Sequence, residues 1–183
     1  MQQSHELTLI IKAQKGDFRA FRMLVEANQG FAYAVAKKIL YSEEDALDAT
    51  QESFIKMWKN LKQFKHSFKL KTWLYRIVTN TCIDMLRATH NTADPLVKAD
   101  SIVMEDLQYS EKRSDDMEMV EIVHSLLQKL PPIQKVVFVL RDIEGMSVTE
   151  TAEILDYSPE IIKSNLYHAR VKMREWLEKI YSE

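Results

Sequence analysis

The chain has 183 residues, a length that predicts two small domains, each large enough to bury its own core. It contains only three glycines and four prolines, which excludes a turn-rich all-β fold, because globular proteins on average use roughly three times as many. The longest apolar run, residues 31–36, is far shorter than the roughly 20 residues of a membrane-spanning helix, so we expect no membrane insertion. Cys82 is the only cysteine and no secretion leader is visible, which together predict a cytoplasmic protein without disulfides.

The formal net charge of −2 conceals regions of opposite sign. Residues 61–90 carry six basic side chains and one acidic one, whereas residues 91–125 carry three basic and nine acidic ones. A charged block is most often a solvated surface, but a basic tract is also what a polyanion such as nucleic acid requires. The motifs along the chain must decide between these two interpretations.

Capping signals and apolar spacing predict the first helices. Gly16 stops one helix and Asp17 caps the next, and apolar residues then recur at helical spacing. Ser42, three residues before Asp45, resembles a capping box that opens a long helix. One face of that helix is an apolar stripe of Ala46, Ala49, Ser53, Phe54, Met57, Trp58 and Leu61. Its other face carries Asp48, Gln51, Glu52, Lys56 and Lys59.

A further amphipathic helix follows a short break at residues 65–68. Its apolar stripe begins at Trp73, and we expect it to end near Arg87, so that the first domain covers residues 1–90. Residues 91–116 are polar, acidic and without sustained periodicity, which predicts a flexible acidic linker.

The second domain is predicted over residues 117–183. Its first helix stops before Pro131, and the β-branched run 136–140 is compatible with either a strand or a helix. We expect a helix that ends at Gly145, because the apolar residues keep the 3.6-residue period and a single strand would have no partner. The whole chain is thus predicted to be all-α, with two small helical domains.

Two helix starts, at Ser147 and Ser158, form the most informative local pattern. Ser147 and Glu150 form a capping box, and Ser158 precedes a proline at the first helical position. A short helix and a longer one around Asp156 have the spacing of a helix-turn-helix, and aspartate tolerates the left-handed backbone of such a turn. If the apolar residues of the second helix face the core, its outward face carries Glu160, Lys163, Ser164, Tyr167, His168, Arg170, Val171 and Arg174.

This outward face suits DNA, because lysine and arginine bind phosphates or guanine edges and serine adapts to either contact. A helical hairpin with a charged exterior has the same spacing, so spacing alone leaves both interpretations open. The acidic residues nearby weaken the affinity of this domain alone for a polyanion. A partner protein that brings the domain to DNA would compensate for the lost affinity.

Three segments carry a family resemblance: Asp48 to Trp58, with its D-x-x-Q-E pattern, Lys71 to Asn80, and Leu130 to Arg170, which contains the helix-turn-helix. In this order, and with a linker between them, they resemble bacterial RNA polymerase sigma factors of the extracytoplasmic-function (ECF) branch. The resemblance implies that the first domain, sigma region two, binds core RNA polymerase through Asp48, Gln51, Glu52 and Lys56.

The resemblance also implies that the first domain opens the upstream promoter element and that the second, sigma region four, recognises the distal element. The residues implied in opening are Phe64, Phe68, Lys69, Lys71, Trp73, Arg76 and Asn80. Those implied in distal recognition are Lys163, Ser164, Tyr167, His168, Arg170 and Arg174. Opening DNA needs cations for the backbone and aromatic faces for unstacked bases, and the basic tract supplies both.

The aromatic residues of the first domain differ in their expected exposure. Phe64 lies in a predicted loop and is the aromatic residue that we expect to be exposed. Trp73 lies on an apolar stripe, so a place in the core suits it equally well. Phe54 and Trp58 are expected to be buried.

The chain departs from the family pattern where Glu160 and Ile161 replace the usual Gly–Thr pair. The resemblance therefore does not imply which promoter sequence the protein recognises. The resemblance further implies an anti-sigma protein as a partner and a place at the nucleoid when polymerase is bound. Two other functions fit the helix pattern: a stand-alone helix-turn-helix regulator that binds an operator without polymerase, and an adaptor that binds only proteins.

No enzyme site is expected. Glu121 and His124 have the spacing of half a di-metal carboxylate site, but the other half is missing. The sequence also lacks the phosphate-loop, nucleophile-elbow and zinc-protease patterns. We therefore expect no catalytic residue, metal or cofactor.

Overall fold

The structure is a computed structural model, and it describes residues 2–65, 69–92 and 115–182. Within these ranges the chain forms helices and no strand, so the expected all-α class is confirmed. The chain divides into two compact units, Met1–Met85 and Leu86–Glu183, which we call unit 1 and unit 2. Most of the expected linker lies outside the described residues. No helix in the described ranges combines the length and apolar character needed to span a lipid bilayer.

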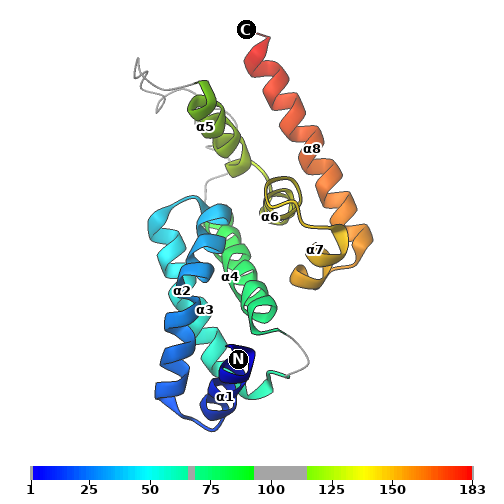
Figure 1. Cartoon of the computed structure of the whole chain (residues 1–183). Helices are drawn as coiled ribbons and strands as arrows, with labels where there is room; N and C mark the ends of the chain where they lie inside the picture. Colours follow the sequence, from blue (N-terminus) through cyan, green and yellow to red (C-terminus); the bar gives the residue numbers. More distant parts are fainter. Residues whose placement is uncertain (1, 66–68, 93–114, 183) are drawn as a thin grey trace. The chain divides into compact units, whose positions relative to one another are not determined.

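Unit 1 is organised around helix α2 (Phe18–Leu40), on which α1 (Gln2–Gln14) and α3 (Glu43–Asn60) both pack (Figure 1). A 3₁₀ turn, η1 (Leu61–Gln63), follows α3 and leads toward α4 (Leu70–Thr92). The expected caps are confirmed: the carboxylate of Asp17 accepts from the N–H groups of Arg19 and Ala20, and the hydroxyl of Ser42 accepts from that of Asp45.

The core of unit 1 is formed by the apolar stripes of its helices. Leu24 and Ile39 of α2, Met57 of α3 and Leu74 and Val78 of α4 are essentially inaccessible to solvent. Burial of each such side chain contributes on the order of 1.5–3 kcal/mol, which fixes the face that each helix turns inward.

Helix α4 is longer than predicted, because it continues to Thr92 rather than ending near Arg87. The residues after Arg87 are polar and lack the apolar period that marks a buried helix. However, no glycine or proline interrupts the chain before Pro95, so nothing in the sequence stops the helix at Arg87.

Unit 2 contains α5 (Asp115–Gln128), α6 (Pro132–Phe138), α7 (Val148–Leu155) and α8 (Pro159–Tyr181) (Figure 1). Between α6 and α7 lies one π-helical turn, η2 (Val139–Ile143). The β-branched run is helical, as predicted. The chain leaves η2 at Gly145, whose φ of 68° is a left-handed conformation that suits glycine.

The turn between α7 and α8 is fixed by local hydrogen bonds. In the predicted capping box, the hydroxyl of Ser147 accepts from the N–H of Glu150 at 3.1 Å, and a carboxylate oxygen of Glu150 accepts from the N–H of Ser147 at 2.8 Å. Asp156 closes α7 in the predicted left-handed conformation, with φ 59° and ψ 40°. Ser158 then caps α8 by accepting from the N–H of Ile161. These interactions confirm the helix-turn-helix that the sequence predicts.

Asp156 offers a test of this turn. Asp156→Gly should leave the free energy of unfolding of unit 2 unchanged or raise it, because glycine adopts a positive φ without steric cost. Asp156→Val should lower it by about 1–2 kcal/mol, because a β-branched residue clashes in the left-handed region. Denaturant titration of the full chain, followed by circular dichroism, measures both changes. Glu153→Val, at an exposed position of α7, is the control, and an Asp156→Val variant as stable as that control would contradict the expectation.

The capping box should also make unit 2 sensitive to acid. The hydroxyl and backbone N–H of Ser147 hold the pKa of Glu150 below its usual value of 4.5. A lowered carboxyl pKa contributes stability that is present above the usual pKa and is lost as the pH falls through the lowered one. Glu150→Gln should therefore reduce the fall in Tm on acidification, whereas Glu153→Gln should not. Equal acid sensitivity of the Glu150→Gln variant and the wild type would show that this carboxylate contributes nothing.

Candidate functional site

The outward face of α3 is acidic with an apolar ridge. Asp48, Gln51 and Glu52 are all exposed, as the interface prediction requires. Leu47 and Ile55 are exposed too, and with Gln51 they form a row at intervals of four residues, which lies along one side of the helix. An apolar ridge beside carboxylates suits a partner helix that is both basic and apolar.

The sequence analysis did not include Leu47 and Ile55 in this surface. The signal was available, because both residues fall outside the apolar stripe of α3, where a large apolar side chain has no core to enter.

Lys56 follows Asp48 and Glu52 at intervals of four residues on α3. Its side chain is about two-thirds buried, and its Nζ lies 3.2 Å from Oδ2 of Asp84. Because Asp84 belongs to α4, the ion pair connects α3 to α4. Lys56 thus has a structural partner that the sequence analysis did not identify.

Phe64 is not exposed, and the expectation that its ring is available to DNA is wrong. The residue is only 6% exposed, and its ring packs against that of Trp73, with 4.8 Å between ring centroids. The side-chain amide of Gln14 donates to the carbonyls of Leu61 and Phe64, each at 3.0 Å. These bonds hold the chain after α3 against α1, so the residue is turned inward although it lies in a connection.

The predictions for the other aromatic residues have different outcomes. Phe54 is buried as expected, while Trp58 is half-buried and packs on Phe18 and Phe21 of α2. Trp73 is half-buried, so part of its ring stays accessible. Phe68 lies outside the described residues.

Four of the five remaining predicted opening residues lie on one face at the start of α4, and Lys71 lies on another side of the helix. Lys69, Trp73, Arg76 and Asn80 follow one another at intervals of four, three and four residues, and therefore share a face over about 16 Å. Lys69, Lys71 and Asn80 are exposed, and Trp73 and Arg76 are half-buried. This face of α4 thus combines cations, one aromatic ring and one side-chain amide.

Phe31 of α2 forms a second aromatic surface with Tyr75 and Lys71, which the prediction from the sequence did not include because Phe31 falls in an apolar helix stripe. Its half-buried ring lies 5.7 Å from that of Tyr75, at 59°, and Nζ of Lys71 lies 5.6 Å from its centroid. A partly exposed aromatic pair beside a lysine is an arrangement on which an unstacked base can rest. No local signal separates Phe31 from a core residue, because its partners lie 40 and 44 positions away.

On α8 the predicted separation of faces is present. Ile162, Leu166, Ala169 and Met173 are buried. The exposed face includes Lys163, Ser164, Tyr167, His168, Arg170 and Arg174. The rings of Tyr167 and His168 meet edge to face, with 5.5 Å between centroids.

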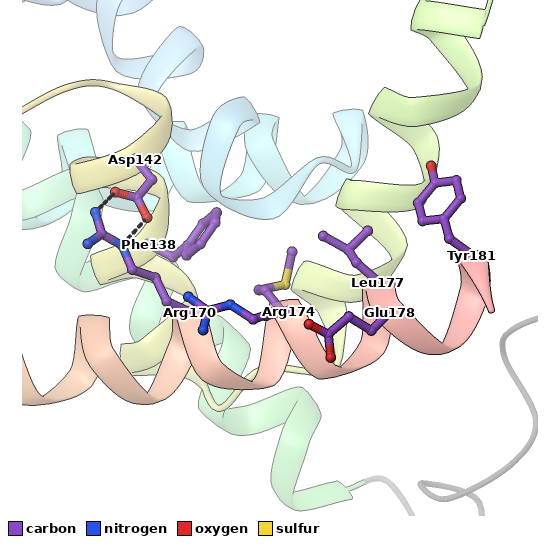
Figure 2. Close-up of a pocket in the computed structure, with 8 residues that line it drawn as sticks. Phe138, Asp142, Arg170, Arg174, Leu177, Glu178 and Tyr181 are labelled. Atoms are coloured by element: carbon purple, nitrogen blue, oxygen red, sulfur yellow. Dashed lines mark hydrogen bonds and ion pairs between the residues drawn. The ribbon is translucent and has the colours of Figure 1, made fainter.

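Arg170 is exposed but not unpartnered. Its Nε donates to Oδ2 of Asp142 at 2.9 Å and its Nη2 donates to Oδ1 at 2.5 Å (Figure 2). These hydrogen bonds raise the pKa of Arg170 above its already high usual value.

The start of α8 is acidic and apolar. The backbone N–H of Glu160 and the hydroxyl of Ser158 hold the pKa of Glu160 below its usual value, so this carboxylate is charged at neutral pH. Ile161 beside it is exposed. The N-terminal end of α8 therefore carries a negative charge and an apolar side chain.

No group of three or more potential metal ligands occurs in the described parts of the chain. His124 has a pKa below its usual value, because it is partly buried and lies near the charge of Lys135.

Two family models match the chain, one in each half of it. Sigma-70 region 2 matches residues 24–92, and Sigma-70 region 4 matches residues 121–173.

Curated relatives match along nearly the whole chain. The ECF RNA polymerase sigma-E factor of Salmonella typhimurium strain LT2 is 30% identical over 179 residues, which cover 91% of this chain and 93% of that protein. The RNA polymerase sigma-H factor of Pseudomonas aeruginosa is 28% identical and covers 99% of this chain and 98% of its own. SigW of Bacillus subtilis, also an ECF RNA polymerase sigma factor, is 28% identical over 93% of this chain and 96% of its own.

Solved structures show the same fold. CnrH, in complex with the cytosolic domain of CnrY, superposes with a TM-score of 0.60 at 27% identity and covers 96% of this chain and 98% of its own. RpoE of Bartonella quintana, in complex with the anti-sigma factor NepR, is similar in fold, with a TM-score of 0.57 at 22% identity over 86% of this chain and 96% of its own. With region 2 and region 4 both matched in order, the chain belongs to the ECF branch of the sigma-70 family of RNA polymerase sigma factors.

Proposed function

We propose that this sigma factor docks on core RNA polymerase through α3, opens the upstream promoter element with the start of α4, and binds the distal element with α8. The single observation that carries this proposal is the placement of the three predicted surfaces, because each is largely solvent-exposed on a helix whose opposite face is buried. We assign residues 1–90 to sigma region two and 117–183 to sigma region four, with 91–116 between them.

Core binding is assigned to Asp48, Gln51 and Glu52, joined by Leu47 and Ile55. The carboxylates steer a basic partner helix toward α3, and the two apolar side chains supply area that leaves water on docking. Lys56 has a smaller role in this proposal, because its Nζ is held by Asp84.

Promoter opening is assigned to the exposed face of α4 and to Phe31. Lys69, Lys71 and Arg76 neutralise phosphates, while the rings of Trp73 and the Phe31–Tyr75 pair supply faces for an unstacked base. The amide of Asn80 supplies one donor and one acceptor for a base edge. Phe64 supports Trp73 from beneath and takes no direct part.

Distal recognition is assigned to the outer face of α8. Lys163, Ser164, Tyr167 and His168 occupy its second and third turns, and Arg174 follows about two turns after Tyr167. The charged carboxylate of Glu160 weakens binding of the isolated module to DNA, so polymerase docking supplies much of the affinity.

The chemistry of RNA synthesis belongs to polymerase, and this chain needs no catalytic residue. We place the protein in the cytoplasm, where that enzyme acts. An anti-sigma protein is proposed as the inhibitory partner, and family membership supports this assignment.

Run-off transcription from genomic DNA tests the function as a whole. Core polymerase with the full chain should initiate at a defined subset of promoters, and Asp48→Arg should weaken core binding by about tenfold or more, because it puts a cation where a basic partner docks. Glu26→Arg, at an exposed position of α2, is the matched control and should bind core as the wild type does. Operator binding without polymerase, together with no promoter-specific transcript, would instead favour a stand-alone regulator.

The aromatic pair is tested by Phe31→Leu, which keeps apolar volume and removes the ring. Open-complex formation on a duplex promoter should fall by roughly fivefold to a hundredfold, because stacking on one aromatic ring contributes about 1–3 kcal/mol per base. Permanganate reactivity of unpaired thymines measures the effect, and a template with a pre-opened bubble should reduce the defect. Phe18→Leu, an exposed aromatic residue at the start of α2, is the control. Equal opening by the Phe31→Leu and Phe18→Leu variants would remove Phe31 from the site.

A further inference from the structure

Arg170 is connected to Asp142 in a way that limits what it can offer to DNA. Its Nε and Nη2 bind the two carboxylate oxygens of Asp142 side by side, at 2.9 and 2.5 Å. This is the bidentate geometry in which a guanidinium and a carboxylate fit each other best. Nε has no further hydrogen to donate, so this edge of the guanidinium group cannot also bind a phosphate in a bidentate manner.

The pair joins two elements that are distant in sequence. Asp142 lies in η2, the π-helical turn that leads into α7, and Arg170 lies 28 residues later, near the middle of α8 (Figure 2). A π-helical turn inside a helix often marks a functional position. The ion pair therefore connects α8 to the turn that precedes the helix-turn-helix, at the edge of the buried stripe of α8.

The position of Arg170 on α8 relates this ion pair to DNA binding. Lys163, Tyr167, Arg170 and Arg174 follow at intervals of four, three and four residues and lie along one face. Asp142 thus lies next to the row that faces the duplex. Unpaired, its carboxylate would repel phosphates; paired with Arg170, the two charges cancel.

The exposed fractions of the two side chains agree with this geometry. The side chain of Asp142 is 22% exposed, whereas that of Arg170 is 53% exposed, so the arginine reaches down from α8 to a carboxylate that is mostly enclosed. Both residues line a shallow depression of about 540 Å³, together with Arg174, Phe138 and Met173.

We propose that Arg170 is a positioning residue: it acts through Asp142 to hold α8 on η2 in the orientation that presents Lys163, Tyr167 and Arg174 to promoter DNA. This inference rests on the proposed function, and it changes the role that the family resemblance implied for Arg170. Arg174, one turn further along, is exposed and has no ion pair among the described residues, and it is the arginine that binds a phosphate.

The decisive variant is Asp142→Asn, because the two roles of Arg170 predict opposite signs. If Arg170 bound a phosphate directly, removal of the neighbouring carboxylate would free the guanidinium and tighten DNA binding. If Arg170 positions α8, the same change loosens the helix and weakens binding. We expect weakening of about threefold to thirtyfold, the range of coupling between contacting residues. Glu153→Gln, which removes an exposed carboxylate of α7, should not weaken binding.

Affinity is measured with the full chain in holoenzyme, on a promoter fragment identified by run-off transcription, across a range of salt concentrations. Arg170→Gln should weaken binding with little change in the slope of log K against log salt. Arg174→Gln should reduce that slope by about 0.9, the value for one phosphate contact. The exchanged pair, Asp142→Arg with Arg170→Asp, should recover most of the affinity. Tighter binding by Asp142→Asn, or no recovery by the exchanged pair, would overturn the proposal.

Hydrogen exchange of the free chain separates failure of this inference from failure of the proposed function. Backbone amides of residues 155–162 should exchange faster in the Asp142→Asn and Arg170→Gln variants and return toward wild-type rates in the exchanged pair. Unchanged exchange in both single variants would overturn the positioning role, whether or not the wild type binds any promoter. If wild-type holoenzyme binds no promoter while exchange responds as expected, the proposed function fails and the connection between η2 and α8 stands.

Discussion

The division of each long helix into a buried and an exposed face is the constraint on which the binding surfaces depend. Helices α3, α4 and α8 each bury an apolar stripe, and the residues on the opposite side are then left in solvent. Because the helical period is 3.6 residues, the inward placement of Met57 also determines the outward placement of Asp48 and Glu52. The core beneath each helix therefore determines which of its residues lie in solvent.

This constraint explains which features the sequence could predict. Helix starts at Asp17, Ser42, Ser147 and Ser158 depend on neighbours within three residues, so local rules suffice to find them. The left-handed conformation of Asp156 is likewise a local property. The exposed faces follow from the buried stripes, and so most candidate site residues were correctly placed on the surface.

Apart from Leu47, Ile55 and the end of α4, the features that local patterns missed involve a partner distant in sequence. Phe64 was expected in solvent because it lies in a connection, but Gln14, 50 residues earlier, holds its carbonyl. Lys56 and Arg170 looked like free cations, and each has a carboxylate partner 28 residues away. Periodicity says that a side chain points outward, but it cannot say which other helix has a group within reach.

These ion pairs also change the meaning of the charge pattern. A count of basic residues suggests that each is available to a polyanion, yet Lys56 and Arg170 are neutralised within the fold. The cations that remain for the distal element are then few, and the charged carboxylate of Glu160 opposes them at the start of α8.

The composition at the start of α8 bears on specificity as well as on affinity. Residues near the start of a recognition helix lie closest to the base edges, and the Ser158 cap fixes the rotation of that first turn. A carboxylate there accepts a hydrogen bond from cytosine N4, and an exposed isoleucine contacts a thymine methyl group, whereas neither can bind a phosphate. In the proposed function, Glu160 and Ile161 therefore lower general affinity and add contacts that depend on sequence. Such an arrangement suits a protein that polymerase brings to DNA, because docking supplies the affinity and the helix supplies the choice of site.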